Sequence, residues 1–129
     1  MSIRNQLLPL VGLLMMTACG GGGGGSTPTA PTTPTVTNTI TITSQGASPR
    51  NIQITAGSRV TFINNDTRAH NMTSDPHPEH TACPELNQVG LLAAGQSRES
   101  GNLNTVRTCG FHDHDNPGTS SLLGTITIR

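Results

Sequence analysis

Lysine, tryptophan and tyrosine are absent from this sequence of 129 residues, and there are only two phenylalanines. Charged residues make up 11% of the chain, and its seven arginines are balanced by seven aspartates and glutamates. Proteins that bind nucleic acids need clustered basic side chains for the phosphates and aromatic rings on which single-stranded bases stack. Because the sequence has no basic cluster and only two aromatic rings, nucleic acid is excluded as its main partner.

Long apolar runs are also rare. The longest covers residues 7–16, which is half of the about 20 residues that a membrane-spanning helix needs. It follows Arg4 and leads into Met-Thr-Ala-Cys at 16–19, which resembles the cleavage box of a bacterial lipoprotein. We therefore predict a signal peptide at 1–18, with Cys19 as the lipid-modified first residue of the mature protein. A signal peptide that is cleaved without lipidation is the alternative.

Residues 19–35 consist mostly of glycine, threonine and proline, a composition typical of an extended spacer. We expect them to tether a single small domain, residues 36–129, to a membrane through the lipid. The predicted location is the bacterial cell envelope, with the domain facing the periplasm or the cell surface.

Cysteine is scarce too, with three residues in the chain. If Cys19 carries a lipid, then Cys83 and Cys109 remain as a pair in an oxidising compartment. Such a pair usually forms a disulfide, but Cys109 could instead be a thiolate ligand of a metal ion. The residues alone leave both alternatives open.

An alternation of apolar and polar residues runs through much of the predicted domain and is typical of half-buried β-strands. It predicts strands at 36–43, 51–55, 59–64, 105–111 and 124–129. Short strands separated by Gly and Pro turns favour an all-β fold, a small antiparallel β-sandwich. The alternation disappears between residues 65 and 95, where we expect a long loop with one helical turn near 85–89.

The five histidines lie in two segments. His70, His77 and His80 are in the predicted long loop, and His112 and His114 lie just before the last strand. Strand ends that are far apart in sequence can meet at one pole of a sandwich, where small β domains commonly carry their sites. Imidazoles that converge there would bind copper or zinc. We predict His70, His112 and His114 as ligands. His77 and His80 are further candidates, with ordinary solvated side chains as the alternative for them.

The order His-Asp-His at 112–114 also suggests a role for a carboxylate. Strand alternation would place the two imidazoles on one side and Asp113 on the other, where it would orient a ligating imidazole or face solvent. Asp113 or Glu79 could also add a carboxylate ligand to a site made of histidines.

Three stretches carry a family resemblance. VTFINNDTRAHN at 60–71 is similar to the segment that holds the first histidine ligand of the cupredoxins, the small copper-binding β-sandwich proteins that include plastocyanin and azurin. GQS at 95–97 and TCGFH at 108–112, followed by GTITI at 124–128, are similar to the last strands of that family. The resemblance covers most of the predicted domain and implies a Greek-key sandwich with a copper cofactor.

The resemblance implies two ligand sets. Cupredoxins hold copper with two His, one Cys and often an axial Met, and the Cys-x-x-His spacing carries these ligands over to His70, Cys109 and His112. Counting back from the last strand instead places the family's Cys nearer Asp113. In that register the chain resembles a divergent variant in which His-Asp-His replaces the Cys-centred ligand set, and Cys109 is free to pair with Cys83.

The two roles of Cys109 imply two functions. A thiolate with two imidazoles accepts both Cu(I) and Cu(II), which favours electron transfer with a protein redox partner. A disulfide leaves an all-imidazole site for Cu(II) or Zn(II), which favours metal sequestration or delivery to a partner protein. Two further hypotheses are a metal-free surface module stapled by its disulfide, and a copper site that reacts with superoxide or another oxidant. No general-base arrangement is visible, so we do not predict an enzyme, and we expect a monomer.

Overall fold

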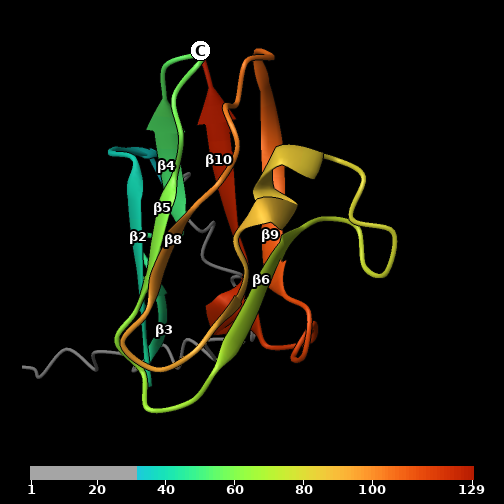
Figure 1. Ribbon diagram of the computed structural model, residues 1–129. Coiled ribbons are helices and arrows are strands. Elements are labelled where there is room, and N and C mark those ends of the chain that lie inside the picture. Colours follow the sequence, from blue (N-terminus) through green and yellow to red (C-terminus); the bar gives the residue numbers. More distant parts are fainter. Residues whose placement is uncertain (1–31) are drawn as a thin grey trace, which may run out of the picture. The chain divides into compact units, whose positions relative to one another are not determined.

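The computed structural model describes residues 32–129 (Figure 1). The predicted signal peptide, the predicted lipid site at Cys19 and most of the predicted tether therefore lie outside the described residues. Within residues 32–129, no helix is long and apolar enough to cross a membrane.

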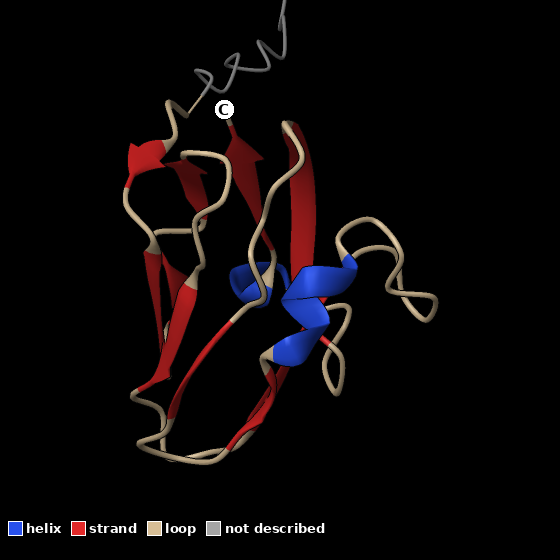
Figure 2. Ribbon diagram, turned by 45° about the horizontal axis from the view of Figure 1, so that its top comes forward, coloured by secondary structure: helices blue, strands red, loops and turns tan. Residues whose placement is uncertain are grey.

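The described residues form two β-sheets that pack face to face (Figures 1 and 2). The first sheet has the strand order β1 (Thr35–Val36), β4 (Asn51–Ile54), β10 (Gly124–Ile128), β9 (Arg107–Asp113), β6 (His70–Ser74) and β7 (Gly90–Leu92). The second sheet has the strand order β3 (Gly46–Ser48), β2 (Thr39–Thr43), β5 (Thr61–Asn64) and β8 (Ser97–Glu99). The connections contain two short 3-10 helices, η1 (Pro84–Gln88) and η2 (Ser120–Leu122).

Both sheets mix strand directions. Strand β4 runs parallel to β1 and to β10, and β2 runs parallel to β5, while the other neighbours are antiparallel. The predicted all-β sandwich is confirmed. The alternation of apolar and polar residues could not predict the parallel pairs. Strands β4 and β10 come from opposite ends of the domain, and alternation carries no information about their relative direction.

Period-two alternation builds the core between the sheets, as predicted. In β2, β4 and β10 every isoleucine is at most 6% exposed, and the threonines, Asn and Gln between them lie on the outer faces. Phe62 of β5 and Phe111 of β9 meet edge to face, with ring centroids 5.4 Å apart. Because the inner faces supply the core, the outer faces of the sheets are free to carry a site.

Strand β6 lies inside the segment predicted to be a loop. Its buried positions are His70, Met72 and Ser74, and the two positions between them are half-buried. The period of two is therefore present, but two of the three inward residues are polar, so hydrophobicity did not reveal it. The helical turn expected near 85–89 is confirmed as η1.

Cys83, just before η1, and Cys109, in the middle of β9, form a disulfide across 26 positions of sequence. Both residues are completely buried. The predicted pairing is thus confirmed. Because a disulfide sulfur is not a thiolate, this bond excludes the ligand set His70, Cys109 and His112.

Candidate metal centre

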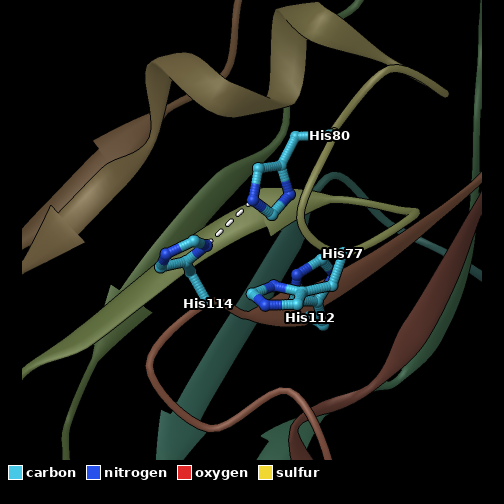
Figure 3. A group of neighbouring side chains, drawn as sticks. All are labelled: His77, His80, His112 and His114. Atoms are coloured by element: carbon cyan, nitrogen blue, oxygen red, sulfur yellow. Dashed lines mark hydrogen bonds between the residues drawn. The ribbon is translucent and has the colours of Figure 1, made fainter.

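Four of the five histidines converge on one point of the domain (Figure 3). His77, His80, His112 and His114 each offer one ring nitrogen, and the four nitrogens lie within 4.8 Å of one another. His112 belongs to the end of β9 and His114 follows it directly. The other two belong to the loop that connects β6 to η1.

The four rings lie on the outer face of the first sheet. His112 pairs with Thr73 of β6, and its Nε2 lies 3.4 Å from Thr73 Oγ1. The inward positions of β6 flank Thr73 on both sides, so Thr73 and its partner His112 face outward. The rings of His77 and His80 lie 5.5 and 5.0 Å from the His112 ring, and His112 is only 1% exposed. The four histidines therefore lie under a loop on the outer face of the first sheet, whereas the prediction placed them at a pole of the sandwich where strand ends meet.

Asp75 fixes the orientation of the His112 ring. His112 Nδ1 donates to Asp75 Oδ1 at 2.6 Å, which leaves the lone pair of Nε2 available to a metal ion. Gly110 makes room for this contact, since a Cβ at that position would collide with the Asp75 carboxylate. The backbones also meet, because Asp75 N donates to Gly110 O at 3.0 Å. Asp75 was not predicted from the sequence as a residue of this site; its only signal there is an acidic residue two positions before His77.

Main-chain groups fix the His80 ring. Its Nδ1 donates to Ser74 O at 2.8 Å, so Nε2 carries the lone pair, and this atom lies 2.8 Å from His114 Nδ1 (dashed line in Figure 3). The carbonyl of His80 accepts bonds from Ser74 Oγ at 2.9 Å and from Asn87 Nδ2 at 2.8 Å. These bonds hold His80 at φ 54°, a left-handed conformation that is uncommon for residues with a Cβ and that recurs at functional sites.

The nitrogen positions fit a single metal ion. Metal–imidazole bonds are about 2.0–2.1 Å long, so nitrogens on one ion lie about 3–4 Å apart. The pair formed by His80 and His114 already lies at 2.8 Å, and the whole group spans no more than 4.8 Å. The four nitrogens therefore lie close to the spacing that ligands of one metal ion have.

His77 is the most exposed of the four histidines. Among residues 32–129 its ring makes no hydrogen bond, and its neighbours are the rings of His114, His112 and His80 at centroid distances of 4.9, 5.5 and 5.6 Å. Desolvation, and then the positive charge that His114, His112 and His80 carry when protonated, lower the pKa of His77 below its usual value of 6.5. At neutral pH His77 is therefore in the neutral form that binds metals.

His70 lies outside this group, unlike the prediction that grouped it with His112 and His114. Its side chain points into the sandwich, where Nδ1 lies 2.9 Å from Asp113 Oδ2 and Nε2 lies 3.1 Å from Asp66 Oδ2. Both ring nitrogens thus face carboxylates, and the residue is 1% exposed. The structural reason is that His70 occupies an inward position of β6, whereas His112 occupies an outward position of β9.

Asp113 interacts with His70 and not with a histidine of the four-residue group. Its Oδ2 also accepts a bond from Asn116 Nδ2 at 3.0 Å, and Oδ1 accepts bonds from the backbone N–H groups of Asn71 and Asp115 at 3.0 and 3.1 Å. Burial opposes the charged form, but these hydrogen bonds keep the pKa of Asp113 below its usual value of 3.8.

Asp66 and Glu79 also lie near histidines, but one is buried and the other is exposed. The bond from His70, supported by Thr67 N and Arg68 and only partly opposed by burial, lowers the pKa of Asp66 to about 2. Glu79, considered as a carboxylate ligand, is exposed and does not belong to the four-histidine group.

No protein-family model and no curated protein matches the chain, but solved structures do. A purple cupredoxin from Nitrosopumilus maritimus superposes with a TM-score of 0.56 and 20% identity, over 72% of this chain and 100% of that one. A plastocyanin from Dryopteris crassirhizoma gives 0.55 and 21%, over 70% and 99%. An amicyanin variant in the Cu(I) form gives 0.52 and 17%, over 70% and 80%. At these identities the likeness is one of fold, and the two-sheet domain described here is a cupredoxin-like β-sandwich.

Proposed function

We propose that this domain binds one copper ion through His77, His80, His112 and His114. The observation that carries the proposal is the convergence of four ring nitrogens within 4.8 Å. Two of the rings are held by bonds from their second nitrogen, to Asp75 and to the carbonyl of Ser74, as is usual for metal-ligating histidines. Imidazole sites bind Cu(II) more tightly than the other divalent metals of the first row, and the fold is that of copper proteins such as amicyanin.

The ligand chemistry favours copper holding and delivery over fast electron transfer. The disulfide removes Cys109 from the ligand set, and no thiolate remains among the four ligating groups. Four imidazoles suit Cu(II) better than Cu(I), so a change of oxidation state would demand rearrangement of the site. His112 is buried while His77 is exposed, which gives an ion a way in and out through one ligand. We therefore infer that the partner is a protein that supplies or accepts copper.

The proposed place of action is the bacterial cell envelope. The box Met-Thr-Ala-Cys at 16–19 and the Gly/Thr/Pro-rich residues 19–35 support a lipid anchor on Cys19. The disulfide between Cys83 and Cys109 supports an oxidising compartment, because such bonds rarely persist in the cytosol.

Titration with Cu(II) tests the proposal directly. We expect the purified chain to retain one equivalent of copper after dialysis, with an electron paramagnetic resonance (EPR) signal of nitrogen-ligated Cu(II). The visible spectrum should show only weak bands, because the intense charge-transfer band of blue and purple copper sites needs a thiolate ligand. Loss of the copper on dialysis would contradict the proposal, and an intense band would contradict the all-imidazole ligand set.

Copper affinity is expected to fall on acidification. Only neutral imidazole binds metal, so protons compete with copper. Because the pKa of His77 lies below 6.5, this ring stays neutral to a lower pH than a free histidine does. Affinity should therefore change little from pH 8 to about 7 and fall steeply at lower pH, as protons compete with copper for the imidazole nitrogens. Competition titrations against a chelator at several pH values measure this, and an affinity that is the same at pH 5 and 7.5 would contradict histidine ligation.

A further inference from the structure

Beneath the metal centre lies a second cluster of ionisable groups that copper binding does not use. The side chains of Asp66, His70 and Asp113 are 3%, 2% and 0% exposed. His70 bridges the two carboxylates, with 3.1 Å from its Nε2 to Asp66 Oδ2 and 2.9 Å from its Nδ1 to Asp113 Oδ2. Burying such groups is costly and gives little net stability even when they are paired. Their presence in the interior therefore calls for a role beyond packing.

The cluster connects segments that are far apart in sequence. Asp66 follows β5, His70 begins β6 and Asp113 ends β9. His70 lies within hydrogen-bond distance of both carboxylates and so connects the loop after β5 to the end of β9. Arg68 lies 3.3 Å from Asp66 Oδ2 but is largely exposed, so it adds only a weak contact from the surface.

Asp113 stands between two of the four histidines. Its carboxylate accepts bonds from the N–H groups of Asn71 and Asp115 and from the Asn116 side chain. The segment after β9 is held further by the bond from Asn116 N to Asp113 O at 3.0 Å, and by the bond from His114 N to Asn71 O at 2.7 Å. The backbone around His114 is thus fixed by contacts to Asp113 and to Asn71, the residue that follows His70.

We infer that His70 is a positioning residue of the copper site. Together with Asp66 and Asp113 it forms a buried clamp that holds the segment 112–114, so that the rings of His112 and His114 face outward while Asp113 faces inward. The inference rests on the proposed function, because it assigns the clamp to the copper site. Its physical basis is strand alternation: locking Asp113 to the inner face sets the direction of the residues on either side.

The test replaces His70 and compares the variant with an equally buried polar residue elsewhere. His70→Gln keeps a donor for one carboxylate and removes the histidine bond to the other. The matched control is Ser100→Ala. Ser100 is 1% exposed, and its Oγ accepts a bond from Val60 N at 2.9 Å and donates to Gly101 O at 2.8 Å, with no contact to the four histidines. Both variants are expected to lower the urea midpoint of unfolding.

Measuring copper binding then distinguishes a positioning role of His70 from a general effect on the stability of the fold. We expect His70→Gln to weaken copper binding by about 10- to 100-fold, the range found for residues that orient metal ligands, and to change the EPR hyperfine splitting of bound Cu(II). Ser100→Ala should leave both unchanged. A His70→Gln variant that loses stability but keeps the wild-type affinity and EPR signal would overturn the inference.

Two further measurements keep the test decisive. If His70→Gln does not fold, Asn116→Ala is the substitute, because it removes only one hydrogen-bond donor from Asp113. Asn116→Ala should weaken copper binding and alter the EPR signal. Unchanged copper binding in this variant would overturn the inference. In the copper-free protein, amide hydrogen exchange at His114 and Asp115 should be faster in His70→Gln than in Ser100→Ala. This exchange result decides the clamp even if the wild-type chain proves not to bind copper, which would overturn the proposed function alone.

Discussion

Replacing His112 by alanine should lower the copper affinity by more than about 100-fold, the upper end of the range for residues that only orient ligands. His112 is the most buried of the four histidines, and its ring is held by Asp75. A buried and pre-oriented ligand loses little freedom on binding, so it contributes more than a mobile exposed one. Isothermal titration with Cu(II), in the presence of a weak competing chelator, measures the change.

His77→Ala is the matched comparison for this prediction. His77 belongs to the same group of nitrogens, but it is exposed and its ring has no hydrogen bond within residues 32–129. Its removal should weaken copper binding clearly less than His112→Ala does, and it should speed copper release to a chelator. Equal losses for the two variants would mean that burial and ring orientation do not determine how much each histidine contributes to copper affinity. An unchanged affinity in His112→Ala would mean that His112 is not a ligand.

Removing the disulfide should have the largest effect on stability. We expect Cys83→Ala combined with Cys109→Ala to lower the free energy of unfolding by about 3 kcal/mol, because the 26-residue separation leaves a loop of intermediate size unconstrained in the unfolded chain. The bond also lies three residues after His80 and three residues before His112, so it ties together the two segments that carry the ligands. Copper affinity should therefore fall as well. Urea unfolding of the copper-free protein, followed by far-ultraviolet circular dichroism, measures the first effect.

The double serine variant is a control that breaks the same disulfide but places polar side chains at the two positions. Cys83→Ser with Cys109→Ser breaks the same bond but buries two hydroxyl groups in a fully apolar position, so it should be less stable than the alanine pair. A loss below about 1 kcal/mol in the alanine pair would show that the disulfide contributes little to the folded state. An unchanged copper affinity would show that the loop and β9 hold their ligands without it.

Local patterns predicted the strands whose inward residues are apolar. Ile40 and Ile42 in β2, like Ile126 and Ile128 in β10, alternate with threonine and are buried as expected. Strand β6 was not predicted, because its inward residues include His70 and Ser74, which do not contribute to a hydrophobic pattern. The polar inward face is itself a sign of function, since buried polar groups need partners that a plain core does not supply.

The site was predicted in part. Metal ligation by the histidines stays a prediction, but His112 and His114 belong to the four-histidine group, as do His77 and His80, which were named as further candidates. His70 does not, and Asp75 enters as an orienting carboxylate that the sequence did not reveal. Asp113, for which an orienting role was considered, contacts the buried His70 and not a histidine of the four-residue group.

The sequence by itself predicted the class of fold, named Cys83 and Cys109 as a candidate pair, and located the two segments that hold all five histidines. These follow from periodicity, cysteine count and residue type, which are local properties of the chain. Only the tertiary structure decided which histidines meet. The pairing of Thr73 with His112, and of Met72 with Asp113, sends one side chain of each strand outward and the next inward. A shift of one residue in that register would exchange the two faces, and a hydrophobic pattern fixes it poorly when the inward residues include a histidine, a serine and an aspartate.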